Sequence, residues 1–166
     1  MPNTFTLISS TTVGSGGAAS VTISSIPSTY TDLCLKMSAA NTSASWIDWQ
    51  IQLNTTGSSY TQRIFYTNGA AVGNSIDNAI QPRTPLSTQS WDNDELYILN
   101  YTGSNFKATS RDQAWSRSAT VAGSSFNGLE TALWSDTAAV TSIRILPTSA
   151  NIAQHSTFYL YGIKKD

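Results

Sequence analysis

Charged residues are scarce in this chain. Asp, Glu, Lys and Arg make up 11% of its 166 residues, against the ~25% that is usual in soluble domains. The formal net charge is −1, and no run of basic residues occurs. A nucleic-acid groove needs clustered Lys and Arg to displace counterions, so we expect no nucleic-acid partner. The 25 serines and 22 threonines predict a surface of hydroxyl groups instead of ions.

Cysteine and histidine each occur once, as Cys34 and His155. A single cysteine excludes an internal disulfide, and one cysteine with one histidine cannot form a structural zinc site alone. Cys34 is out of phase with its apolar neighbours in an alternating run, and we expect a structural thiol. No Gly-x-Ser-x-Gly elbow accompanies His155, so we expect it to lie exposed or against a loop. No cofactor is predicted.

Long apolar runs are also missing. No stretch of 18 apolar residues occurs, and the first residues, Met1 to Phe5, contain no basic segment. We therefore expect no membrane-spanning helix, no secretion signal and no membrane partner.

Alternation of apolar and polar residues is what the chain has most of. Every second residue is apolar in Ile47–Leu53 and Leu33–Ala39, and similar alternation runs through Tyr97–Tyr101 and Thr157–Ile163. A period of two is typical of a β-strand with one face in a core and one in water. No apolar stripe of helical spacing persists over three turns. We predict a buried core containing Leu33, Leu35, Ile47, Trp49, Ile51, Leu53, Leu133, Ile143 and Ile145.

Turn residues divide the chain into about ten short strands. We predict them at Thr4–Val13, Ser20–Ile26, Tyr30–Ala39, Ser45–Leu53, Tyr60–Tyr66, Glu95–Tyr101, Phe106–Trp115, Leu129–Ser135, Val140–Leu146 and Ser156–Lys164. Such spacing predicts an all-β fold, a two-sheet antiparallel sandwich of jelly-roll type. We expect one domain over residues 1–166 with a short N-terminal arm, Met1–Thr6. The stretch from Asn68 to Asn93 is too long for a hairpin loop, and such stretches are usually functional.

One carboxylate cluster and one separate glutamate merit a metal-binding or an enzymatic interpretation. Asp92-Asn93-Asp94-Glu95 could hold Ca²⁺, but the EF-hand pattern is absent and we favour a solvated loop leading into a strand. Whether a metal ion sits at Asp92 and Asp94 stays open. Glu130 alternates with Leu129 and Leu133 and has no second carboxylate in matching phase, as a glycosidase would need. We predict an ordinary outward-facing residue and no enzymatic activity.

Two tryptophans are candidates for exposure. Trp46 is out of phase with Trp49, and Trp91 lies in the long irregular stretch. An exposed aromatic ring can stack on a sugar or anchor a protein interface.

Four stretches, taken in their order and spacing, resemble a family of small structural proteins of tailed phages, particularly those of aquatic and cyanobacterial hosts. These stretches are Ser25–Leu33, Leu96–Ser104, Ala132–Ile143 and Phe158–Lys164, and the resemblance spans nearly the whole chain. It implies a virion component, a capsid decoration or cement protein built on a jelly roll. Such a protein would be made in the host cytoplasm and located on the capsid surface. No binding residue is carried over from the family.

Two functions of different classes follow. The first is a decoration protein that bridges subunits of the major capsid protein and acts as a homotrimer. Its candidate contacts are Met1, Pro2, Asn3, Thr4, Trp46, Trp91, Asp92 and Asp94. The alternative is a tail-fibre or spike head module that binds host-surface glycan through an exposed tryptophan beside Asp92, Asn93 and Asp94. An enzyme that degrades host polysaccharide is a distant third.

Overall fold

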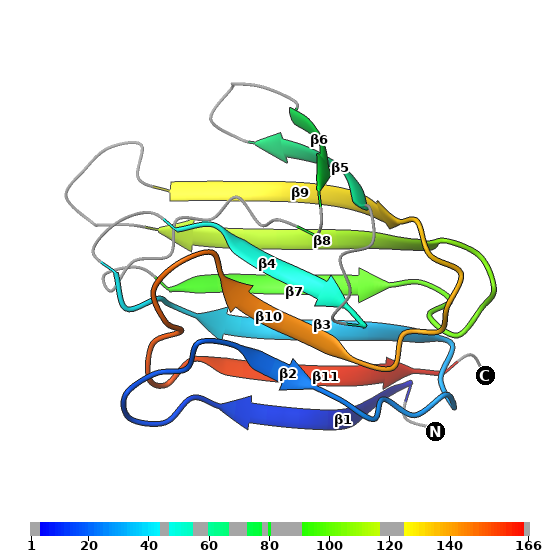
Figure 1. The fold of residues 1–166 in the computed structure, drawn as a ribbon, viewed down its shortest axis with the longest axis horizontal. Helices are drawn as coiled ribbons and strands as arrows, with labels where there is room; N and C mark the ends of the chain where they lie inside the picture. Colours follow the sequence, from blue (N-terminus) through cyan, green and yellow to red (C-terminus); the bar gives the residue numbers. More distant parts are fainter. Residues whose placement is uncertain are drawn as a thin grey trace.

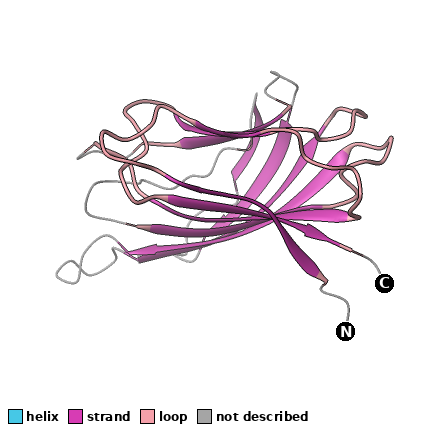
Figure 2. Cartoon of the chain, turned by 90° about the horizontal axis from the view of Figure 1, so that it is seen from below, coloured by secondary structure: helices cyan, strands magenta, loops and turns pink. Residues whose placement is uncertain are grey.

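The chain forms two antiparallel β-sheets that pack face to face in the computed structural model (Figure 1). The structure describes residues 4–43, 47–54, 60–66, 73–77, 80, 91–116 and 125–164. Within these residues one sheet has eight strands and the other has three. Figure 2 shows the small sheet lying across one face of the large sheet. The predicted all-β, two-sheet antiparallel sandwich is confirmed.

Eleven strands make up the two sheets. They are β1 (Phe5–Thr12), β2 (Val21–Ile23), β3 (Asp32–Ala39), β4 (Trp49–Leu53), β5 (Tyr60–Tyr66), β6 (Gly73–Asp77), β7 (Asp92–Ile98), β8 (Lys107–Ser116), β9 (Ser125–Trp134), β10 (Ile143–Pro147) and β11 (Thr157–Ile163). The strand that sequence reasoning missed is β6, which lies inside the stretch expected to be irregular. Among the described residues, none belongs to a helix that is long and apolar enough to cross a membrane.

Strands from the start of the chain pair with strands from its end, as expected of a jelly roll. The large sheet has the order β1-β11-β3-β7-β8-β9-β5-β6, and the small sheet has the order β2-β10-β4. The first strand therefore pairs with the last, and the second with the last but one. Ile80 bridges to Ile51 and continues the small sheet beyond β4. Strands β8, β9, β5 and β6 extend the large sheet past the small one (Figure 1).

Among the described residues, the core lies between the sheets and is built largely from alternate residues of the inner strands. Both β4 and β10 alternate between buried and half-buried positions along their whole length. The rings of Trp49 and Phe158 lie 6.3 Å apart and join the two sheets. Eight of the nine predicted core residues are buried, and Leu133, at 38% exposure, is not. Leu133 lies opposite Ala108 on the outer side of the sheet, whereas its neighbours Ala132 and Trp134 face inward.

Strand phase was also misjudged in β7 and β11. The structure buries Leu96 and Ile98 in β7, and Phe158 and Leu160 in β11. The residues between them, which the alternation marked as apolar, face the other way. Apolar or aromatic residues occur in both phases of β11 and in both phases at the end of β7, so periodicity alone does not choose the inner face. The consequence is a row of tyrosines on the face of the large sheet that points away from the small sheet, hereafter the outer face.

Candidate functional site

The predicted N-terminal arm, Met1–Thr6, lies partly outside the described residues and partly in the first strand. Met1, Pro2 and Asn3 lie outside the described residues, and so does Trp46. Thr4 is exposed, and its carbonyl oxygen accepts a hydrogen bond from the backbone N–H of Lys164 at 3.1 Å. Residues 5 and 6 pair with residues 163 and 162 in the ladder between β1 and β11. The last two residues of the predicted arm therefore belong to the first strand, as the predicted strand Thr4–Val13 also implied.

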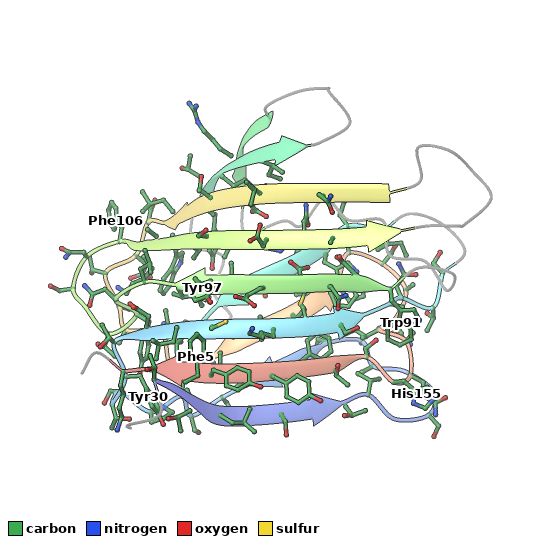
Figure 3. The ribbon with its side chains drawn as sticks, turned by 180° about the vertical axis from the view of Figure 1, so that it is seen from behind. Phe5, Tyr30, Trp91, Tyr97, Phe106 and His155 are labelled. Atoms are coloured by element: carbon green, nitrogen blue, oxygen red, sulfur yellow. The ribbon has the colours of Figure 1, made fainter. Side chains whose placement is uncertain are left out.

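Trp91 and the two aspartates beside it do not share a surface. Trp91 is 46% exposed and directly precedes β7 (Figure 3). Asp92 and Asp94 are buried, at 0% and 6% exposure, because alternate residues of β7 face the interior. The expected solvated loop is part of a strand, and only Asn93 and Glu95 point to the outer face. The sugar platform predicted from Trp91 with Asp92 and Asp94 is thus not formed, and burial removes both aspartates from the surface as candidate contacts.

A buried ionic cluster joins three neighbouring strands of the large sheet. Arg111 of β8 donates to Asp94 of β7 through Nε and Nη2, the latter at 2.5 Å. Its Nη1 donates to Oε2 of Glu130 on β9 at 2.8 Å. Glu130 is 2% exposed, so the prediction of an outward-facing residue is wrong. Glu130 lies opposite the buried Arg111 and faces inward with it, so its neighbour Leu129 faces out at 58% exposure. An apolar residue is therefore outside and a charged one inside, the reverse of the arrangement expected for a strand with one face in water.

The charges in this cluster are strongly coupled. Burial raises the pKa of Glu130 to about 7, although Arg111 acts to lower it. Burial opposes the charge on Arg111, but Asp94 and Glu130 outweigh it and raise the pKa of the guanidinium above its usual value. Among the described residues, Oε1 of Glu130 has no hydrogen-bond partner. The same residues contain no group of three or more His, Cys, Asp or Glu that could hold a metal ion.

Sequence reasoning did not single out Arg111. In the printed sequence it lies between Ser110 and Asp112, and nothing local distinguishes it from a surface residue. Only the pairing of β8 with both β7 and β9 brings its two carboxylate partners to it.

The outer face carries a shallow hollow of about 630 Å³, hereafter the trough. Two rows of side chains cross five strands of the sheet and line it, each row made of residues that lie opposite one another in the ladders. The first row is Tyr159, Lys36, Glu95, Asp112 and Leu129. The second row is Thr157, Ser38, Asn93, Ala114 and Asn127. The second row contains the short side chains of Thr157, Ser38 and Ala114, whereas the first row contains the longer side chains of Tyr159, Lys36 and Glu95.

Charge-assisted hydrogen bonds hold Lys36 and Glu95 of the first row in place. Nζ of Lys36 lies 2.6 Å from Oε2 of Glu95. The hydroxyl of Tyr97 also bonds to Glu95, and together Lys36 and Tyr97 hold the pKa of this carboxyl below its usual value. The pair is partly exposed, so it contributes little to stability. It does fix the position of three side chains at the middle of the outer face.

Aromatic side chains cover the sheet next to the trough. Tyr161 and Tyr97 lie on either side of Cys34 in the ladders, and Phe5 meets Tyr161 edge-on at 6.2 Å. Figure 3 looks onto this face and labels Phe5 and Tyr97 on it. Cys34 is fully buried, and this burial raises the pKa of its thiol to about 11, as expected for a structural cysteine. His155 is exposed, as predicted, in a turn at the edge of the molecule (Figure 3).

Comparison with known proteins gives no family. No family model matches the chain, and no curated protein matches it. Among solved structures, the chain is similar to the CBM2 module of the evolved Dit of Lactobacillus casei BL23 phage J-1. The identity is 10% and the TM-score is 0.18, over 89% of this chain and 69% of that one. A similarity of this size carries no argument about the fold or the function of the present chain.

Proposed function

We propose that this protein is a structural component of a tailed-phage virion, specifically a capsid decoration protein. In this role it binds the outer shell and bridges neighbouring subunits of the major capsid protein. The free energy comes from burial of apolar surface, and no bond is made or broken. The sequence resemblance to small phage structural proteins supports this class.

The observation that carries the proposal is the apolar character of the outer face. Five large apolar or aromatic side chains there are more than one-third exposed: Phe5, Leu7, Leu129, Leu133 and Tyr159. Phe5, Leu7 and Tyr159 lie on the neighbouring strands β1 and β11, and Leu129 and Leu133 lie on β9. A cluster of large exposed apolar side chains usually marks a surface that binds a partner. A broad, low-charge sheet face suits contact with more than one capsid subunit.

An unpaired sheet edge supplies a second means of attachment. β1 is the last strand at one end of the large sheet, so one of its edges has no neighbouring strand within the described residues. Such an edge can add a strand from a partner through backbone hydrogen bonds. We further propose a homotrimer, which fits the local three-fold positions of an icosahedral shell.

The proposal includes the absence of catalysis. The carboxylates of Asp94 and Glu130 are buried and both are bound by one arginine. This arrangement favours a structural role over an acid–base pair facing a substrate.

The second candidate is the head module of a tail fibre or spike, and the trough on the outer face favours it. The two candidates differ in copy number, because a decoration protein covers the shell and a fibre head is present in far fewer copies. The test uses purified particles of the phage that encodes this chain. We expect a gel band comparable in intensity with that of the major capsid protein, and antibody label over the capsid. Sparse label on the tail would establish the second candidate, and particles without the protein would exclude both.

A further inference from the structure

The trough has the dimensions of a site for an extended ligand. Neighbouring strands of a sheet lie about 4.8 Å apart, so the rows that cross β11, β3, β7, β8 and β9 are roughly 19 Å long. The volume of about 630 Å³ falls within the range of ligand sites in proteins. The hollow is open to solvent, and rows of this length suit a chain molecule better than a compact one.

The side chains that line the trough suit a polyhydroxylated, uncharged ligand. Tyr159 offers an exposed ring at one end, on which the apolar face of a sugar can stack. Asn93 and Asp112 are exposed and present hydrogen-bonding groups along the middle. The charge on Lys36 is balanced by Glu95, so the lining has one unbalanced negative charge, at Asp112. That charge disfavours an anionic ligand.

The middle of the trough is also ordered before any ligand binds. Glu95 is held by Lys36 and by Tyr97, and the strands beneath are paired on both sides. A rigid site loses less conformational freedom when it binds, and this favours affinity. Two exposed apolar side chains, Tyr159 and Leu129, stand at the two ends of the trough, whereas Phe5, Leu7 and Leu133 lie outside it.

We propose that the trough binds a neutral glycan chain, laid across the five strands with a sugar ring on Tyr159 and hydroxyl groups bonded to Asn93 and Asp112. This site differs from the tryptophan platform predicted from the sequence. Glycan binding at the trough is compatible with a protein on the capsid and with a protein on the tail. Glycan binding and particle location are therefore tested separately, and either proposal can fail without the other.

The test is an array of printed neutral and acidic polysaccharides and oligosaccharides, probed with the full chain and followed by titration calorimetry on the glycans retained. We expect binding to neutral chains of several sugars. We expect Tyr159→Ala to weaken this binding at least tenfold. Ala114→Trp, which places a large side chain in the second row and fills the hollow, should abolish the binding. Trp91→Ala is the matched control, since it removes an exposed aromatic outside the trough, and we expect unchanged binding.

Thermal unfolding of each variant checks that the fold is retained. Three results would overturn the proposal: no neutral glycan bound at millimolar concentration, retention of acidic glycans only, or neutral binding that Ala114→Trp leaves unchanged. Self-association of the chain that Ala114→Trp abolishes, without any glycan binding, would assign the trough to a second copy instead.

Discussion

At the scale of single residues, we expect substitution of Arg111 to lower the stability of the fold strongly. Its guanidinium is buried and is balanced by carboxylates from the strands on both sides. Removing ions from water costs several kcal/mol each, and their mutual attraction offsets this only while every partner is present. A cluster of this kind fixes the register of β7, β8 and β9 more than it adds net stability.

We expect Arg111→Met to lower the free energy of unfolding by about 3–5 kcal/mol, because it leaves two buried carboxylates without their cation. Urea denaturation followed by tryptophan fluorescence measures the change. Lys36→Met is the matched control: it breaks a partly exposed ion pair and is expected to cost about 1 kcal/mol or less. Equal losses in the two variants would show that the cluster at Arg111 is not buried as described.

The shifted pKa of Glu130 predicts how stability depends on pH. The pKa is raised from its ordinary 4.5 to about 7 in the folded state. The folded protein therefore holds this proton more tightly than the unfolded chain does. The contribution is fully present below pH 4.5 and is lost as the pH rises through about 7.

We therefore expect the free energy of unfolding to fall between pH 5 and pH 8, and Glu130→Gln to flatten that slope. Glu95, whose pKa is lowered, acts in the opposite direction but only near and below pH 4.5, outside this window. Urea titrations at several pH values give the slope. A slope that Glu130→Gln leaves unchanged would assign the pH dependence to other groups.

At the scale of the element, strand phase decides which side chains meet the core and which meet a partner. Leu133 of β9 faces out at 38% exposure, and Leu160 of β11 faces in at 0%. We expect Leu133→Ala to change the free energy of unfolding by about 0.5 kcal/mol or less. Leu160→Ala should cost about 2–5 kcal/mol, since it opens a cavity in the core. The two substitutions remove the same atoms. Similar losses in the free energy of unfolding, measured by heat or urea, would therefore contradict the assigned strand phases.

The same strands show what the sequence could and could not predict. Ile47, Trp49 and Ile51 alternate with polar residues, and their burial follows from that pattern alone. In β11, Phe158 and Leu160 alternate with Tyr159 and Tyr161, and only pairing with β3 decides which set turns inward.

The candidate site was less predictable than the fold, for a physical reason. The trough takes one residue of each row from five strands, of which β3 and β11 are far in sequence from β7, β8 and β9. It depends on the registers of all five. No local pattern encodes a register. Trp91 was expected at the surface and is there, whereas Asp92 and Asp94 followed a strand phase that composition did not reveal.

At the scale of the whole molecule, the large sheet offers a broad outer face and an edge strand, β1, close to the start of the described chain (Figure 1). These two surfaces meet at Phe5 and Leu7, whose side chains are exposed on the outer face of that edge strand. A partner bound there can contact the face and the edge together. Attachment through β1 therefore depends on residues at its N-terminal end.

The role of the N-terminal residues is best tested by deleting residues 1–4, because residues 5 and 6 belong to the β1 ladder and their loss would also shorten a strand. We expect the truncated chain to keep its circular dichroism spectrum and melting temperature. It should bind particles more weakly, and decorated particles should release DNA at a lower temperature. Unchanged affinity for particles would show that these residues have no clamping role. Sedimentation of the full chain tests the trimer, and a protein that is monomeric both free and on the particle would exclude the trimer. Attachment through the outer face is tested separately by Leu7→Asp, which places a charge in the apolar contact.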